Sequence, residues 1–357
     1  MQKSLLWTIG QMIRLWEVID MTILLTGGLG FIGSHTAVEL LNEGHDVIIV
    51  DNLSNSKEDV YIKIRQLGKG GHVVFKPYDT RDEVAMDAVF KEFKPEVVIH
   101  FAGLKAVGES MEKPDLYYEW NLESTISLLK VMKYNNCKKI IFSSTATVYF
   151  PTVDLDEDSF LKPTNTYANT KYLQELMLKD LAENHDFNVC ILRYFNPIGA
   201  HPSGLIGENP NGRPNNLMPY INKVAIGELP HLNIFGNDYD TWDGTGVRDY
   251  IHVVDLAKAH TLAINYVNEH KYDVFNIGTG KGYSVLDIVK AYENANDVKI
   301  RFKIADRRPG DTDMFWSKPY KAMKYLGWKP EYTLEDMCRD SYNFIRREIS
   351  NDNEIDV

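Results

Sequence analysis

One short segment constrains the fold more than any other: a glycine-rich turn between a buried strand and a helix. An apolar run at residues 22–26 leads into residues 27–33, Gly-Gly-Leu-Gly-Phe-Ile-Gly, and a helical pattern covers residues 31–42. A second apolar run, residues 46–51, ends on Asp51. Glycines at such a turn let the backbone approach a pyrophosphate, which then faces the free N–H groups of the helix N-terminus. The pattern therefore predicts a dinucleotide-binding unit.

The acidic residue and the glycine spacing narrow the choice of cofactor. Gly27, Gly30 and Gly33 follow the spacing Gly-x-x-Gly-x-x-Gly. A carboxylate in the position of Asp51 hydrogen-bonds a ribose 2′-hydroxyl and repels a 2′-phosphate, so we predict NAD rather than NADP. The alternative is an ordinary tight turn, which also needs glycine.

The rest of the first half alternates short apolar runs with helical stretches. We expect strands at residues 22–26, 46–51, 73–76, 97–101, 139–143 and 189–193. We expect helices at about residues 31–42, 57–67, 82–92, 115–135 and 168–185. Such alternation predicts an α/β fold with a Rossmann-type, doubly wound parallel sheet and right-handed crossovers.

After Arg193 the alternation stops, which suggests a second, smaller domain. Residues 196–216 are rich in proline, glycine and asparagine and are expected to form a loop. Beyond the loop we expect helices near 217–227, 254–269 and 333–348, and strands near 273–277 and 299–304. We therefore predict an NAD-binding domain over 21–195 and a mainly substrate-binding α/β domain over 196–350.

The two ends of the chain are predicted to lie outside these domains. Residues 1–20 carry apolar side chains at helical spacing, interrupted by charges. They are either an amphipathic helix packed on the body or an upstream extension from a misassigned start codon, and we favour the second. Residues 351–357 are expected to form a polar tail.

Composition excludes several classes of function. The 357-residue chain has a net charge of −11, which argues against binding nucleic acid or anionic lipid. No apolar run reaches the roughly 18 residues of a membrane span. The three cysteines are far apart and form no CxxC pair, which indicates a reducing, cytoplasmic location. No metal site is predicted, because the chain has no HExxH motif and no dense cluster of histidines and carboxylates.

Tyr167 and Lys171 stand at i and i+4 of a predicted helix, so they share one helix face. An ammonium near a phenol is expected to lower the phenol pKa, which would make Tyr167 a base for a substrate hydroxyl. The same spacing occurs in pairs that we interpret as surface pairs, namely Tyr134/Lys138, Tyr320/Lys324 and Tyr325/Lys329.

The position of Tyr167 distinguishes it from those pairs. It follows the strand that ends in Ser143, Ser144 and Thr145, and ligands of open α/β sheets bind beyond the carboxyl ends of the strands. Any of the three hydroxyls could hold the oxygen that Tyr167 deprotonates. Each could equally be a polar residue that closes a strand.

With these pieces in place, the chain resembles the extended short-chain dehydrogenase/reductases, and within them the UDP-glucose 4-epimerase family. The resemblance covers nearly all of residues 21–345. Its specific segments are residues 25–35, 51–56, 100–110, 192–197, 214–219, 234–239 and 243–252. The segment His-Phe-Ala-Gly-Leu-Lys-Ala-Val-Gly-Glu-Ser, residues 100–110, is far more specific than a glycine pattern.

The resemblance assigns ligand-binding roles residue by residue. NAD would be bound, besides the three glycines and Asp51, by Phe31, Ile32, Asn52, Asn55, Ser56, Asp79, Thr80, Phe101, Ala102, Gly103, Lys105, Tyr167, Lys171 and Phe195. The UDP-sugar would be held by Thr145, Tyr167, Asn196, Asn216, Leu217, Asn233, Phe235, Arg248, Arg308, Asp311 and Phe315. The implied catalytic residues are Tyr167, Lys171 and Thr145, the last standing where the family usually has serine.

The implied reaction interconverts UDP-galactose and UDP-glucose through a transient 4-keto sugar, with tightly bound NAD. A homodimer formed through the helices at 82–92 and 115–135 is also implied. The bulk of Phe315 favours plain hexoses over N-acetylhexosamines. The alternatives are a nucleotide-sugar dehydratase or decarboxylase and a non-catalytic, NAD-sensing binding module. A dehydratase would need an acid–base pair beside the catalytic hydroxyl, but Thr145 is followed by Ala146 and Thr147 rather than by a carboxylate. A binding module would not need Tyr167 and Lys171, and both are present.

Overall fold

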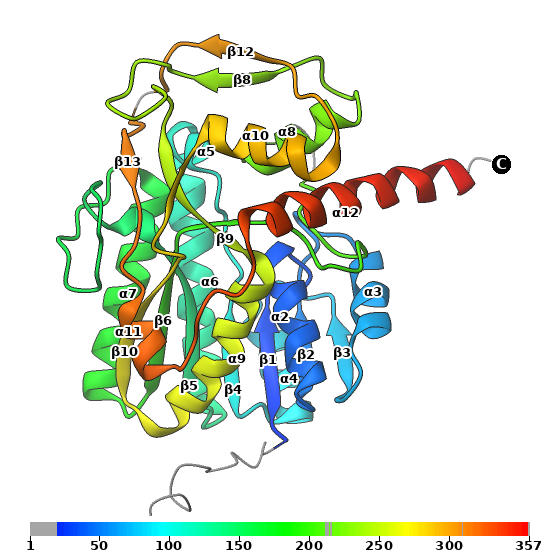
Figure 1. Ribbon diagram of the computed structural model, residues 1–357. Coiled ribbons are helices and arrows are strands. Elements are labelled where there is room, and N and C mark those ends of the chain that lie inside the picture. Colours follow the sequence, from blue (N-terminus) through cyan, green and yellow to red (C-terminus); the bar gives the residue numbers. More distant parts are fainter. Residues whose placement is uncertain (1–19, 211–213, 215, 309, 356–357) are drawn as a thin grey trace, which may run out of the picture.

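A single parallel sheet of seven strands forms the centre of the molecule (Figure 1). The structure is a computed structural model and describes residues 20–355 except 211–213, 215 and 309. In spatial order the sheet runs β10 (Tyr272–Ile277), β6 (Asn188–Tyr194), β5 (Lys139–Thr145), β4 (Val97–His100), β1 (Thr22–Thr26), β2 (Asp46–Val50) and β3 (Val73–Lys76). Every neighbouring pair is parallel. The expected Rossmann-type sheet is confirmed.

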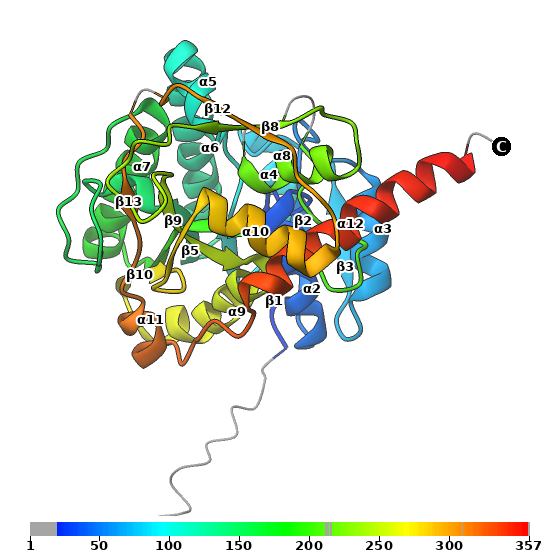
Figure 2. The ribbon, with the colours of Figure 1, turned by 45° about the horizontal axis from the view of Figure 1, so that its top comes forward.

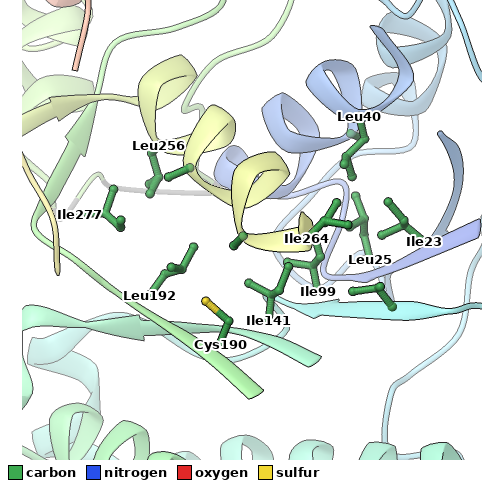
Figure 3. Close-up of a cluster of buried hydrophobic side chains, with 14 of the residues drawn as sticks. Ile23, Leu25, Leu40, Ile99, Ile141, Cys190, Leu192, Leu256, Ile264 and Ile277 are labelled. Atoms are coloured by element: carbon green, nitrogen blue, oxygen red, sulfur yellow. The ribbon is translucent and has the colours of Figure 1, made fainter. Parts of the chain in front are cut away.

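Helices cover both faces of this sheet, which explains why the central residues of its strands are mostly apolar. On one face lie α2 (Phe31–Asn42), α3 (Asp59–Leu67) and α9 (Val253–Glu269). On the other lie α4 (Glu83–Phe93), α6 (Pro114–Tyr134) and α7 (Thr166–Asn184). Successive strand residues point to opposite faces, so Ile23 and Leu25 pack with the first group and Leu24 with the second. Figure 3 shows the first of these cores, with Leu256 and Ile264 of α9 facing the sheet.

The smaller part of the molecule covers the carboxyl ends of the main strands (Figures 1 and 2). It contains β7 (Asn196–Ile198), α8 (Leu217–Ala225), β8 (Leu232–Phe235), β9 (Val247–His252), β11 (Gly282–Ser284), α10 (Val285–Asn296), β12 (Phe302–Ala305) and β13 (Met314–Phe315). One small sheet joins β7, β9, β11 and β13, and a second joins β8 and β12. Two short helices, α5 (Val107–Glu112) and α11 (Tyr320–Tyr325), the 3-10 helix η1 (Ala146–Val148) and the long α12 (Leu334–Ile355) complete the described elements.

Several elements differ from the sequence-based expectation. Helix α9 and strand β10 lie within the range 196–350, yet they pack on the large sheet and extend it. The segment 196–216 is not wholly loop, because β7 pairs with β9. Helix α12 continues to Ile355, whereas we expected it to end near residue 348 and to be followed by a polar tail. Apart from Asp20, the predicted N-terminal extension lies outside the described residues.

Among the described residues, no helix has the length and apolar character needed to cross a bilayer. The same residues contain no group of three or more histidines, cysteines or carboxylates that could hold a metal ion.

A buried histidine connects two strands and a helix below the site. His100, the last residue of β4, is fully buried, with Nδ1 lying 2.6 Å from the Thr26 hydroxyl of β1. Its Nε2 lies 2.9 Å from the Thr125 hydroxyl of α6. Burial, together with the nearby Lys171 ammonium, lowers the pKa of His100 to about 3. The folded protein therefore keeps this imidazole neutral.

We predict that His100 makes the protein less stable in acid. Between pH 6.5 and about 3 the unfolded chain binds a proton at this site that the folded chain does not, so the free energy of unfolding falls as the pH falls. His100→Gln should make this dependence shallower by about 1.4 kcal/mol per pH unit between pH 5.5 and 4.5, measured by urea unfolding. The exposed His72, changed to Gln, is the control. An equal slope in wild type and His100→Gln would contradict the prediction.

Candidate active site

The glycine turn lies where β1 and β4 end side by side, and two of its glycines have no room for a side chain. Gly27 has φ +67°, and a Cβ there would stand 2.8 Å from the Ala102 backbone nitrogen. A Cβ on Gly33 would stand 2.5 Å from the Gly27 carbonyl oxygen. Gly30 is less confined, at 3.3 Å from the same oxygen. The turn thus keeps bare backbone at the start of α2, and such a cradle suits a pyrophosphate.

Asp51 organises the turn from the end of β2. The side chain is 8% exposed, and its carboxylate accepts the Leu29 N–H (3.0 Å), the Leu53 N–H (2.9 Å) and the Ser56 hydroxyl (2.8 Å). A carboxylate has about four acceptor positions, so one is left for a ligand hydroxyl. Asp51 is therefore a structural residue of the turn as well as a predicted ribose partner.

The predicted adenosine end forms a second polar group beyond β3. Asp79 accepts from Asn52 Nδ2 (2.9 Å) and pairs with the Arg81 guanidinium at 3.0 Å. Arg81 holds the pKa of Asp79 at about 2. The guanidinium also lies 4.1 Å from the ring centre of Trp120. Of the neighbouring predicted residues, Thr80 is buried and Asn55 is exposed.

The structure brings the three predicted catalytic residues together above β5. Asn165 caps α7 by accepting the Ala168 N–H (2.8 Å), which places Tyr167 in the first helical turn. The Thr145 hydroxyl interacts with the Tyr167 phenol and favours its ionised form. One turn further, Lys171 is 3% exposed and donates from Nζ to the Ser143 carbonyl oxygen at 2.9 Å.

The electrostatics of the Tyr–Lys pair differ from our expectation. We expected the Lys171 ammonium to lower the pKa of Tyr167. Instead burial raises the pKa of Tyr167 to about 12, and the hydrogen bond with Thr145 opposes this rise. Burial lowers the pKa of Lys171 to about 8, while the Glu175 carboxylate raises it. The expectation was wrong for this structure because desolvation dominates at both residues and the ammonium is directed at a backbone carbonyl.

Behind the pair lies a buried polar network that the sequence analysis missed. Glu175, one turn after Lys171, accepts from the Ser144 hydroxyl and forms a bidentate ion pair with Arg193 of β6, at 3.0 and 2.6 Å. Arg193 also donates to the Tyr149 hydroxyl at 2.8 Å. The i, i+4, i+8 spacing of Tyr167, Lys171 and Glu175 was the available signal, but nothing in the sequence indicated the partner on β6.

Four predicted substrate residues gather in the smaller part of the molecule. Asp311 pairs with Arg308 Nε at 2.9 Å and with Arg248 Nη2 at 3.4 Å. The Arg308 guanidinium lies 5.0 Å from the ring centre of Phe235. Arg248 is oriented further by the Val247 and Thr312 carbonyl oxygens, each at 2.8 Å. Two guanidinium groups held this way form a cationic site of the kind that binds a diphosphate.

Lys105 and Asn216, predicted to bind different ligands, share one carboxylate. Glu208 Oε1 lies 2.9 Å from Lys105 Nζ and 2.7 Å from Asn216 Nδ2. Glu208 carried no sequence signal, because it stands in the proline-rich segment 103 residues from Lys105.

The remaining predicted substrate residues lie in several elements. The rings of Phe195 and Phe315 contact each other, with centroids 5.4 Å apart. Asn196 begins β7 and Leu217 begins α8. Asn233 lines an open hollow of about 660 Å³ together with Pro214, Tyr220, Lys223, Glu228, Leu229, Pro230 and His231.

A parallel sheet with a glycine turn at the β1–β4 switch point, and a Tyr–Lys pair on the helix after β5, defines an extended short-chain dehydrogenase/reductase. A family model described as GDP-mannose 4,6 dehydratase matches residues 24–341. The UDP-glucose 4-epimerase of Bacillus subtilis is 51% identical over 328 residues, which are 91% of this chain and 96% of that protein.

Solved structures agree with these matches. The UDP-glucose 4-epimerase from Bifidobacterium longum, in complex with NAD+ and UDP, is 50% identical with a TM-score of 0.87, covering 92% of this chain and 99% of that one. The enzyme from Stenotrophomonas maltophila, with bound NAD and formylated UDP-arabinopyranose, is 43% identical with a TM-score of 0.90, covering 93% and 100%. The chain belongs to the UDP-glucose 4-epimerase family, and the resemblance drawn from the sequence is confirmed.

We predict that Gly33→Ala destabilises the protein. The new Cβ would meet backbone of Gly27 and Gly28 at 2.5 and 2.8 Å, and backbone cannot rotate away as a side chain can. Overpacking of this kind should lower the free energy of unfolding by about 1–3 kcal/mol or more in urea titrations. Gly108→Ala is the matched control, because no heavy atom lies within 4 Å of its Cβ position. Equal stability of the two variants would contradict the account of the turn.

Proposed function

We propose that this chain interconverts UDP-galactose and UDP-glucose by inverting C4 of the hexose through a transient 4-keto sugar, with tightly bound NAD. The observation that carries the proposal is the predicted catalytic group itself: the Tyr167 phenol, with the Thr145 hydroxyl and the buried Lys171 beside it, at the carboxyl end of β5. Identity of about 50% to named UDP-glucose 4-epimerases over nine-tenths of the chain supports the same reaction.

The residues of the first half fit NAD. Gly27 and Gly33 leave backbone bare for a pyrophosphate, and Asp51 keeps an acceptor position for a ribose hydroxyl. Relatives of known structure bind this cofactor. When bound, NAD would accept a hydride from C4 of the sugar, and its nicotinamide ring would provide a positive charge beside the substrate.

The protein's own part is to hold the sugar and to move one proton. Tyr167 would take the proton of the 4-hydroxyl, and Thr145 would hold the same oxygen from the other side. With a pKa near 12, Tyr167 is protonated before the ligands arrive, so it needs positive charge nearby to become a base. Lys171, with a pKa of about 8, is mostly cationic at neutral pH, but it does not lower the pKa of Tyr167 in the structure. The positive nicotinamide ring would supply this charge when NAD is bound. The same proton returns from Tyr167 when the inverted hydroxyl is formed.

Arg248 and Arg308 would hold the diphosphate of the UDP-sugar. They converge on Asp311, which keeps both guanidinium groups oriented before the ligand binds. Fixed guanidinium partners suit a diphosphate because each can donate two hydrogen bonds. The preference for plain hexoses over N-acetylhexosamines stays a prediction, which the contact between Phe315 and Phe195 supports.

The alternatives are weaker. A dehydratase needs an acid–base pair beside the catalytic hydroxyl. Thr145 is followed by Ala146 and Thr147 rather than by a carboxylate, and the Thr147 hydroxyl lies 3.0 Å from the Thr145 hydroxyl. A non-catalytic binding module would not need Tyr167 and Lys171 in the arrangement that the structure has.

Two further parts of the proposal concern assembly and location. Apolar side chains are exposed on the packed pair α6 and α7, namely Tyr118, Ile126, Leu173 and Leu176. This favours a homodimer formed across α6 and α7 in place of the pair expected from the sequence, α4 and α6. The three cysteines are buried and unpaired, in keeping with the reducing environment of the cytoplasm.

We predict that Tyr167→Phe abolishes conversion of UDP-galactose to UDP-glucose without added NAD, measured with a coupled UDP-glucose dehydrogenase. Loss of the proton acceptor should lower kcat by about 10²- to 10⁴-fold. Tyr320→Phe, which changes an exposed tyrosine with the same i+4 lysine, should retain wild-type activity. Absence of conversion by the wild type, even with NAD supplied, would overturn the proposed function.

We also predict that Leu176→Glu gives a monomer. The substitution would bury a charge in the apolar interface, and the free-energy cost of that burial exceeds the stabilisation that the contact provides. In the monomer the side chain at this position is exposed, so the charge stays in water. Light scattering should give twice the chain mass of 40.9 kDa for the wild type and the single mass for the variant. Ile62→Glu, on the exposed side of α3, is the control. A wild-type protein with the mass of one chain would contradict the proposed homodimer.

A further inference from the structure

Glu208 lies at the junction of the two parts of the molecule, and none of the roles assigned above includes it. Its side chain is 8% exposed, and one oxygen, Oε1, accepts from both Lys105 Nζ (2.9 Å) and Asn216 Nδ2 (2.7 Å). A buried carboxylate is costly unless it is paired and hydrogen-bonded, and here both conditions are met.

The two partners belong to different binding regions. Lys105 follows β4 of the main sheet, in the segment predicted to run under the dinucleotide. Asn216 directly precedes α8 of the smaller part, in the segment predicted to hold the UDP-sugar. Glu208 itself stands in the chain between β7 and α8. One carboxylate therefore connects the cofactor side of the site with the substrate side.

Both partners keep hydrogen-bonding capacity for a ligand. The Lys105 side chain is 49% exposed, and its ammonium has three donors, of which Glu208 takes one. Asn216 has the extended backbone of a helix N-cap, with φ −90° and ψ 152°, yet its side chain makes no capping hydrogen bond. Its amide is turned toward Glu208 instead. Glu208 thus sets the orientation of these two side chains and leaves part of their hydrogen-bonding capacity for the ligands.

The charges explain why a carboxylate can stand here. An unpaired carboxylate in contact with residues predicted to bind two anionic ligands would repel those ligands. The Lys105 ammonium neutralises Glu208, and Glu208 in turn limits the directions that the flexible lysine can take. The ion pair is useful to ligand binding only as a unit, since loss of either member leaves a misplaced charge.

We propose that Glu208 is a positioning residue that couples the two ligands, so that dinucleotide and nucleotide sugar each strengthen the binding of the other. The inference rests on the proposed function, because it takes Lys105 as a contact of the dinucleotide and Asn216 as a contact of the nucleotide sugar. Coupling of this kind is reciprocal. It would help the enzyme to retain NAD while a keto sugar is in the site.

Two substitutions separate the two contacts. Glu208→Gln keeps an acceptor for Asn216 but has no charge for Lys105, so the variant should retain less NAD than the wild type after gel filtration while its KM for UDP-galactose stays close to the wild-type value. Glu208→Ala removes both contacts. It should also raise the KM about tenfold, as expected for one lost hydrogen bond to a charged group.

The coupling itself is tested with UDP as the probe. In the wild type, UDP should increase the fraction of NAD retained after gel filtration, and in Glu208→Ala it should not. Glu331→Gln is the control, because this carboxylate pairs with Lys258 at 2.7 Å on the surface away from the site. Its NAD retention and KM should match the wild type.

The outcomes separate this inference from the function on which it rests. A wild-type protein that converts UDP-galactose while both Glu208 variants keep its KM, its NAD retention and its response to UDP would overturn the inference alone. Variants that lose only thermal stability would overturn it too, because a merely structural role predicts that result. A wild type without conversion would overturn the proposed function instead.

Discussion

A buried ion pair between Arg193 and Glu175 holds the catalytic helix against the sheet. Arg193 is 4% exposed on β6 and Glu175 is 3% exposed on α7, and Ser144 of β5 donates to the same carboxylate. Glu175 stands one turn after Lys171 and two turns after Tyr167, so the pair sets the rotation of α7 and thereby the direction of both predicted catalytic side chains. Breaking such a pair is costly because it leaves an uncompensated buried charge. The rest of the site depends on this fixed orientation.

The predicted site combines rigid backbone with preorganised charge. At the cofactor side, Gly27 and Gly33 provide bare backbone, and Asp51 fixes the turn through three hydrogen bonds. The predicted binding cations are held by carboxylates, Arg248 and Arg308 by Asp311 on the substrate side and Lys105 by Glu208 on the cofactor side. Preorganised charge of this kind costs no rearrangement when the anionic ligand arrives.

Sequence reasoning found the parts of the fold and site whose signals are local. The glycine turn, the strand that ends on Asp51 and the pair Tyr167 and Lys171 are each visible within a few residues. Contacts between distant segments left no such signal: β10 joins β6 across about 80 residues, and Glu208 meets Lys105 across 103. The direction of the Tyr167 pKa was wrong for a related reason, since burial depends on the whole fold rather than on helix spacing.

In the proposed epimerisation, the hydrogen at C4 leaves the sugar as a hydride, stays in the site and returns to the opposite face of the sugar. The most direct test is to supply UDP-galactose carrying deuterium at C4 in ordinary water and to follow the UDP-glucose product by mass spectrometry and NMR. The account predicts that the product keeps its deuterium at C4, because tightly bound NAD carries it without contact with solvent. Replacement of the deuterium by solvent hydrogen would contradict the account, since it would mean that C4 is inverted by proton exchange.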